Sequence, residues 1–138
     1  INLMKPIEFI KIIPQEEEVM SLKIIRVSDA GDDQSERLVM KVTDECNLKD
    51  FMVMDCTYEN GQVSNKHRHV YFFPDKSVKK GEYVILFTRS GKNKTGTWND
   101  DDDTVTHRFY WGLDTTVWNE DGDEALVLKY RIVDRKKV

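Results

Sequence analysis

The sequence predicts an all-β fold, an antiparallel sandwich or barrel, from three observations. The first is composition: the chain contains 14 Val, 9 Ile and 9 Thr but only 2 Ala. β-Branched side chains suit a pleated, half-buried surface, whereas Ala is the strongest helix former. The second is a series of short apolar segments separated by turns rich in Gly, Asn, Asp or Pro. The third is the lack of any amphipathic helical pattern of ~10–15 residues, which argues against a βαβ fold.

Several segments are expected to form strands because each is rich in β-branched or aromatic residues and is bounded by a turn. They are residues 20–28, 37–43, 51–58, 69–73, 82–88, 104–111 and 124–134. Residues 82–88 are almost continuously apolar, as expected for a central strand buried on both faces. Asn60-Gly61 predicts a tight hairpin after residues 51–58, because both residues tolerate a positive φ.

The remaining segments are expected to be turns, loops and one N-terminal extension. Residues 29–36, around Gly31, predict a turn. Residues 89–103 predict a long loop in which a basic block precedes the acidic run Asp100 to Asp103. Residues 6–13 are apolar-rich and end at Pro14, so residues 1–19 are interpreted as an N-terminal edge strand or linker. Residues 20–138 are then a single domain, as the length of the chain favours.

The charge balance bears on partners and on compartment. The 138 residues carry 21 Lys and Arg against 25 Asp and Glu, a net charge of −4. An acidic excess argues against broad binding of nucleic-acid phosphates, which normally needs a basic face. No apolar run reaches the ~18–20 residues that span a bilayer. No signal peptide is visible, so the sequence leaves the compartment open, and it does not predict an oligomeric state.

The C-terminal third carries the most distinctive motifs. Residues 109–112 read Phe-Tyr-Trp-Gly, and residues 117–126 read Val-Trp-Asn-Glu-Asp-Gly-Asp-Glu-Ala-Leu. Together they resemble the lamin tail domain family, and a bacterial-type member of it in particular. Upstream blocks agree in order: residues 38–55, then residues 70–75 (Val-Tyr-Phe-Phe-Pro-Asp) and residues 80–84 (Lys-Gly-Glu-Tyr-Val). The similarity covers residues 20–135.

The chain also departs from the family pattern at several positions. Asp50 and Lys76 stand where the family prefers Gly, Phe51 where it prefers Trp, and Lys80 where it prefers Pro. The final hairpin lacks the usual Asp-Gly turn. The resemblance implies an immunoglobulin-like β-sandwich that acts as a non-catalytic interaction or accessory module, bound to a protein, a surface polymer or another macromolecule.

The residues of the C-terminal motif have a structural reading of their own. Trp111 and Trp118 are expected in the core, provided that each indole N–H finds an acceptor. The segment Asn119 to Asp123 predicts a turn in which Gly122 supplies the positive φ. Asn119, Asp121, Asp123 and Glu124 are also oxygen-rich, but the EF-hand spacing for Ca²⁺ is absent. The acidic run Asp100 to Asp103 is expected to be a solvated loop, and whether it binds Ca²⁺ is left open.

No catalytic motif is recognised, so the chain is expected not to be an enzyme and to need no metal or other cofactor. Cys46 and Cys56 match no metal signature and are expected to be free thiols. His67 and His69 would share one strand face and could form half of a Zn²⁺ or Cu²⁺ site, with His107 as a third ligand, but nothing in the spacing brings them together.

The predicted contact surface is the loop 89–103 or an exposed sheet edge. Its candidate binding residues are Trp98, Arg89, Lys92 and Lys94. Trp98 has two interpretations: a ring that folds back over the sandwich, or a ring that stacks on a partner. One alternative function is carbohydrate binding by Trp98 and the acidic loop. Another is weak nucleic-acid binding through basic patches at Lys66, Arg68, Arg135 and Lys136.

Overall fold

The computed structural model describes residues 20–59, 62–98, 103–119 and 122–138, and the side chains of all of these except 57–59 and 62–68. Strands dominate this part of the chain, and its one helical element is the single-turn 3-10 helix η1 (Leu48–Asp50). The strands are β1 (Leu22–Ser28), β2 (Arg37–Val42), β3 (Cys46–Asn47), β4 (Phe51–Glu59), β5 (Gln62–Phe72), β6 (Ser77–Val78), β7 (Tyr83–Phe87), β8 (Lys94–Thr97), β9 (Val105–Tyr110) and β10 (Asp123–Lys129).

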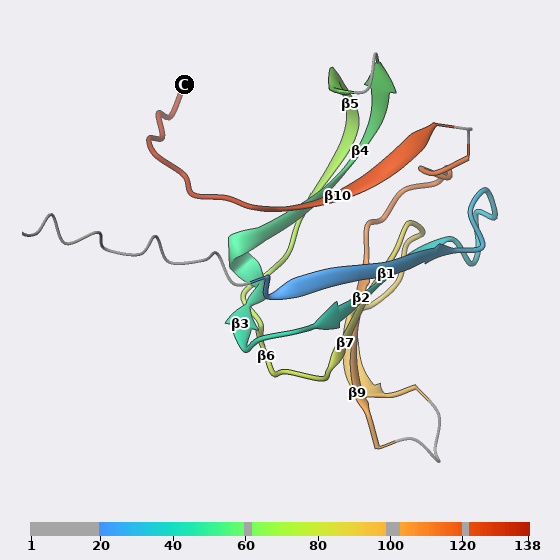
Figure 1. Ribbon diagram of the computed structural model, residues 1–138, viewed down its shortest axis with the longest axis vertical. Coiled ribbons are helices and arrows are strands. Elements are labelled where there is room, and N and C mark those ends of the chain that lie inside the picture. Colours follow the sequence, from blue (N-terminus) through green and yellow to red (C-terminus); the bar gives the residue numbers. More distant parts are fainter. Residues whose placement is uncertain (1–19, 60–61, 99–102, 120–121) are drawn as a thin grey trace, which may run out of the picture.

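Two main sheets form a β-sandwich, as predicted (Figure 1). The larger sheet has five strands in the order β1-β2-β7-β9-β8, and the smaller has three in the order β10-β4-β5. A short pair, β3 with β6, closes one end. β4 and β5 pair antiparallel on either side of residues 60–61, so the hairpin predicted there is confirmed, although Asn60 and Gly61 lie outside the described residues.

The prediction of a purely antiparallel sandwich is wrong at one pair of strands. β7 and β9 run parallel, with Tyr83 opposite Thr106 and Phe87 opposite Tyr110. The cause is β8, which forms the far edge of the larger sheet inside the segment 89–103 that was predicted to be a loop. The chain passes from β7 to this edge and returns as β9 between the two strands. β8 is short and contains Gly96, so its strand pattern is weak in the sequence.

Two strand boundaries also differ from the predictions. β5 starts at Gln62 rather than His69, because it pairs with β4 directly after the hairpin despite its polar sequence. β10 ends at Lys129, whereas a strand was predicted as far as residue 134. Lys129 pairs with Phe51, the first residue of β4. Because β4 begins there, β10 has no strand residue of β4 to pair with beyond Lys129.

The core lies between the two sheets and is built from alternate residues of each strand. Leu38, Met40 and Val42 of β2 are fully buried, as are Val84 and Leu86 of β7. The facing sheet contributes apolar residues of β4 and β5 to the same cluster. The residues between them point outwards, as the two-residue period of a strand requires. This alternation leaves each sheet with a second, outer face.

The expected core positions of Trp111 and Trp118 agree with the structure. Trp118 is buried, Trp111 is partly buried against the same cluster, and their ring centroids lie 5.9 Å apart. The Trp118 indole N–H donates to the backbone oxygen of Glu124 at 3.3 Å. Gly122 has a φ of +90°, as the predicted turn requires, while residues 120–121 lie outside the described part of the chain.

Candidate functional site

The outer face of the five-stranded sheet carries polar and aromatic side chains around a small buried apolar cluster. On β2, Arg37, Val39 and Lys41 alternate with the fully buried core residues. Tyr83, Ile85 and Phe87 do the same on β7, and Thr106, Arg108 and Tyr110 do so on β9. Val39, Ile85 and Phe87 form a small apolar cluster of their own, separate from the main core. We call this surface the outer face.

Arginines and aromatic rings alternate across the outer face in a continuous row. The Arg108 guanidinium lies 4.8 Å from the centroid of the Trp98 ring, and that of Arg37 lies 5.9 Å from the same ring. Arg37 is also 5.9 Å from the Phe87 ring. Each guanidinium over a ring face is attracted by the negative π-surface. The row therefore joins β9, β2 and β7 through Trp98, the residue that follows β8.

The far end of the row holds a stacked pair of rings under a third arginine. Phe87 and Tyr110 stack with centroids 5.1 Å apart and planes only 10° apart. Arg89 lies 5.2 Å from Phe87 and 5.1 Å from Tyr110. Gly91 packs against this end so closely that an added Cβ would come within 2.4 Å of the Tyr110 ring. We refer to these six residues as the cation–aromatic row: Arg108, Trp98, Arg37, Phe87, Arg89 and Tyr110.

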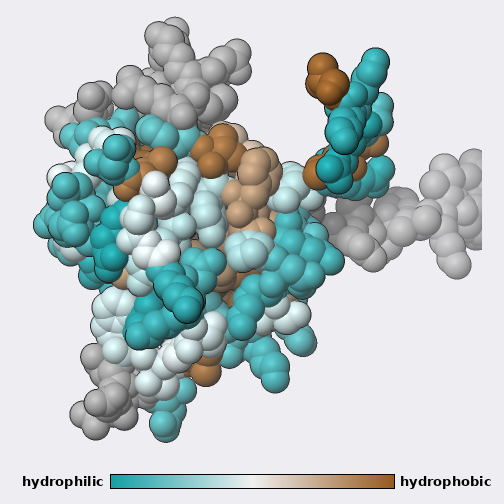
Figure 2. Space-filling model, turned by 180° about the vertical axis from the view of Figure 1, so that it is seen from behind, coloured by the Kyte–Doolittle hydropathy of each residue, from teal (hydrophilic) through white to brown (hydrophobic). Residues whose placement is uncertain are grey.

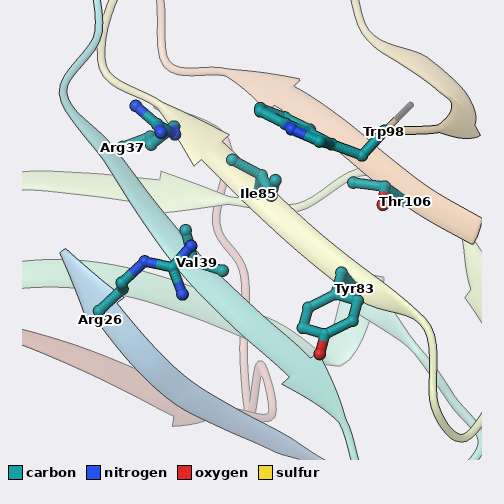
Figure 3. Close-up of a pocket in the computed structure, with 7 residues that line it drawn as sticks. All are labelled: Arg26, Arg37, Val39, Tyr83, Ile85, Trp98 and Thr106. Carbon is teal, nitrogen blue, oxygen red and sulfur yellow. The ribbon is translucent and has the colours of Figure 1, made fainter. Parts of the chain in front are cut away.

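Beside Trp98 the outer face is hollowed (Figure 3). The hollow has a volume of about 300 Å³ and is lined by Arg26, Arg37, Val39, Tyr83, Ile85, Trp98 and Thr106. In Figure 3, Val39 and Ile85 occupy the middle, with Arg26 and Arg37 on one side and Trp98 and Tyr83 on the other. The site therefore has an apolar floor, one cationic side and one aromatic side.

The strands of this sheet are strongly polarised in charge. All five are described, and together they contain six basic residues and no Asp or Glu. The basic residues are Lys23, Arg26, Arg37, Lys41, Lys94 and Arg108. The whole chain has a net charge of −4, so its acidic excess lies in other segments. A sheet of this kind favours an anionic partner.

A buried carboxylate holds the turn that leads into Arg37. Glu36, only 1% exposed, accepts hydrogen bonds from the backbone N–H groups of Gly31, Val117 and Trp118. This holds the turn 29–36 against the core directly before Arg37. The Arg37 guanidinium then donates to Asp29 Oδ2 and to the Ser35 carbonyl, both at 2.8 Å.

A hydroxyl–imidazole–carboxylate chain anchors the edge strand that leads to Trp98. The imidazole of buried His107 on β9 lies 2.9 Å from Thr95 Oγ1 of β8 and 2.9 Å from Glu82 Oε1. Burial alone would raise the pKa of Glu82, but the hydrogen bonds from His107 and from the Lys79 backbone outweigh it and lower that pKa. His107 itself is 3% exposed, and its bond to Thr95 fixes the position of β8 against β9.

The structure separates the residues that the sequence proposed as a binding site. Trp98, 43% exposed, lies in the cation–aromatic row, and Arg89 caps its far end. Arg89 also donates to the carbonyls of Gln34 and Ser90, which fixes its position. Lys92 is exposed in the segment before β8, and Lys94 borders a different hollow beside Pro74 and Asp75.

Sequence reasoning missed Arg26, Arg37, Phe87, Arg108 and Tyr110. They are far apart in the chain, and only the strand order β2-β7-β9 makes them neighbours. The available signal was local: Arg37, Val39 and Lys41 stand at alternate positions in a strand that carries no acidic residue.

Among the described residues, those named for the alternative functions, Trp98 aside, lie away from this site. Arg135 and Lys136 are exposed on the segment after β10, in the smaller sheet, while the side chains of Lys66, His67 and Arg68 lie outside the described residues. Asp121 and most of the Asp100–Asp103 run also lie outside them. His69 lies beside Asp55, with Nδ1 3.6 Å from Oδ2, rather than beside His107.

The smaller sheet also has an exposed surface, on its side away from the core. Two cross-strand rows, Leu128–Met52–Phe72 and Leu126–Met54–Val70, consist only of apolar residues. Phe72 is 56% exposed and its ring packs against Tyr130. Figure 2 shows apolar side chains, in brown, at the surface of the molecule, and the C-terminal segment projects away from that surface. In these two described rows no polar group converges with another, as would be needed to orient a ligand at a specific site.

The cysteines, metal-ligand clusters and helix lengths of the described residues bear on further predictions. Cys46 and Cys56 are free thiols, as predicted, and burial raises the pKa of both. Among the described residues there is no cluster of three or more His, Cys, Asp or Glu side chains placed to hold a metal ion. The same part of the chain has no helix that is long and apolar enough to cross a bilayer. No protein-family model matches the sequence, and no curated protein matches it either.

Proposed function

We propose that this chain is a non-catalytic interaction module, an immunoglobulin-like sandwich of the lamin tail type, and that its outer face binds a protein partner. The observation that carries the proposal is the cation–aromatic row with its adjoining hollow. Arginine and aromatic residues are the types enriched at the energetic centres of protein interfaces. Here they are also held in place by the turn 29–36 and by the hydrogen bonds that join Thr95, His107 and Glu82. Binding a partner therefore costs little further conformational entropy in these side chains.

Two features support a binding role over a catalytic one. The groups on the outer face are cations and aromatic rings, which attract and orient a partner. In the most nearly triad-like set, Thr95, His107 and Glu82, the histidine that would act as the base is 3% exposed, and both of its ring nitrogens already have hydrogen-bond partners. Nucleophilic catalysis needs a nucleophile, a base and oxyanion donors that converge on one accessible point. The outer face instead offers a broad surface whose strands carry one sign of charge.

The test is a selection from a phage-displayed library of random peptides. The wild-type chain is the bait. A double variant, Arg37→Gln with Trp98→Ala, is used for counter-selection and removes peptides whose binding does not depend on the cation–aromatic row. Lys92→Gln is the matched control, because it removes a positive charge from an exposed site outside the row.

The proposal predicts peptides that bind the wild-type chain and the Lys92→Gln variant but not the double variant. A β-sheet circular dichroism spectrum for each bait establishes that the double variant is folded. If every retained peptide binds the folded double variant equally well, the outer face is not the contact surface.

A further inference from the structure

We infer that the hollow on the outer face takes an extended acidic protein segment that carries one apolar side chain. The apolar side chain fills the hollow over Val39 and Ile85, and carboxylates on either side of it meet Arg26 and Arg37. This inference rests on the proposed function, because it specifies the chemistry of the partner that the outer face binds.

The floor of the hollow sets the apolar part of the ligand. Val39 and Ile85 are only 3% and 5% exposed, yet they line the hollow, with Tyr83 and Trp98 forming its aromatic side. The volume of about 300 Å³ is at the lower end of the ~300–1,000 Å³ typical of small-molecule pockets. An opening of this size fits one or two side chains of a longer segment better than a whole cofactor.

The cationic side sets the charge of the ligand. Arg26 and Arg37 line the same side of the hollow in Figure 3, and Arg108 lies under Trp98 next to it. A guanidinium presents parallel N–H donors that match a carboxylate. Arg37 already binds one carboxylate through a single nitrogen, since its Nη1 donates to Asp29 Oδ2 at 2.8 Å. The five strands of the sheet supply no acidic residue of their own to neutralise the rest.

The state of the aromatic rings favours a peptide over a nucleic acid. Sequence-independent binding of single strands depends on rings whose faces are open for stacking on bases. Here Phe87 and Tyr110 stack on each other, and Arg89 lies over both. Two guanidinium groups lie near the Trp98 ring: that of Arg108 is 4.8 Å and that of Arg37 is 5.9 Å from its centroid. The rings are therefore engaged in holding arginines, and the arginines are the groups directed at the ligand.

The experiment measures binding by fluorescence anisotropy with four labelled probes. The first is an acidic peptide with a central leucine, Glu-Glu-Leu-Glu-Glu within a Gly/Ser frame. The second replaces every Glu by Gln, and the third replaces the leucine by serine. The fourth is a single-stranded oligonucleotide of equal net charge, which separates carboxylate recognition from general attraction of polyanions.

The first probe is expected to bind at least ~10-fold more tightly than each of the other three, since charge and apolar contact both contribute. Arg26→Gln should weaken binding of the first probe severalfold without affecting folding, because Arg26 is exposed and its guanidinium bonds only Ser28 Oγ among the hydrogen bonds described. Lys92→Gln should leave binding of the first probe unchanged. Equal binding of the oligonucleotide, or no loss with the Gln peptide, would overturn the inference.

The two proposals fail in different ways. If the random library yields peptides that depend on Arg37 and Trp98 but are not acidic, the outer face remains the contact surface and only the acidic-segment inference falls. If the acidic peptide binds the wild-type chain and the Arg37→Gln, Trp98→Ala variant equally, the acidic-segment inference falls. Both proposals fall together only if every library peptide also binds the two chains equally.

Discussion

Trp98 shows at the residue scale why a large aromatic side chain need not belong to the core. It is 43% exposed and lies on arginines, whereas Trp118 is 5% exposed and lies between the sheets. Trp98→Ala should therefore cost about 1 kcal/mol or less of unfolding free energy. Trp118→Ala should cost ~3–5 kcal/mol. Urea denaturation of both variants measures the difference, and equal losses would place Trp98 in the core.

Glu36 carries a second prediction at this scale. Its buried carboxylate accepts three backbone N–H bonds, from Gly31, Val117 and Trp118. Glu36→Gln replaces one acceptor oxygen by an NH₂ group, so at least one buried donor loses its partner at a cost of about 1–3 kcal/mol. Denaturant unfolding tests this, with Gln34→Glu, at an exposed neighbour, as a control for a charge change in the same turn. An unchanged midpoint for Glu36→Gln would contradict the assigned role.

At the element scale, β8 should depend on the bond between Thr95 and His107. Thr95→Val keeps the shape of the side chain but removes the hydroxyl that lies 2.9 Å from His107 Nδ1. Amide exchange in β8 should become up to ~10-fold faster, since about 1 kcal/mol of local stability is lost. Thr97→Val on the same strand is the control. Equal exchange rates in the two variants would mean that the hydroxyl does not anchor this edge.

The same anchor predicts a dependence on pH. The pKa of Glu82 is lower in the folded chain than its ordinary value of 4.5, because hydrogen bonds from His107 and Lys79 favour the carboxylate despite its burial. The stabilisation is therefore present above that ordinary value and is lost as pH falls through the folded value. The gap in melting temperature between wild type and Glu82→Gln should shrink from about pH 6 to about pH 3. A gap that widens in acid would reverse the assignment.

Elements with a regular apolar pattern could be predicted from the sequence, and those defined by partner strands could not. β1, β2, β4, β7 and β9 were predicted with boundaries close to those observed, because their apolar residues bury in the core. β8 and the start of β5 were missed because their sequences are polar and lack the apolar pattern of a strand. The parallel pairing of β7 with β9 and the grouping of Arg37 with Arg108 depend on strand order, about which spacing along the chain says little.

For the whole molecule, the net charge of −4 conceals a division between a basic sheet and acidic segments elsewhere. Of the four binding residues proposed from the sequence, only Trp98 and Arg89 lie in the cation–aromatic row. The segment 89–103 thus contributes to the outer face through Trp98, which contacts arginines of β2 and β9, and through Arg89, which lies over Phe87 and Tyr110.

The most direct measurement of the contact surface is a ¹H–¹⁵N NMR titration of the whole chain with a peptide retained by the selection. Binding at the outer face predicts the largest shifts at the amides of Val39 and Ile85 and at the indole N–H of Trp98. Val70 and Phe72, on the apolar face of the smaller sheet, should be unaffected. Shifts centred on Val70 and Phe72, with Trp98 unmoved, would contradict the assignment of the outer face as the binding surface.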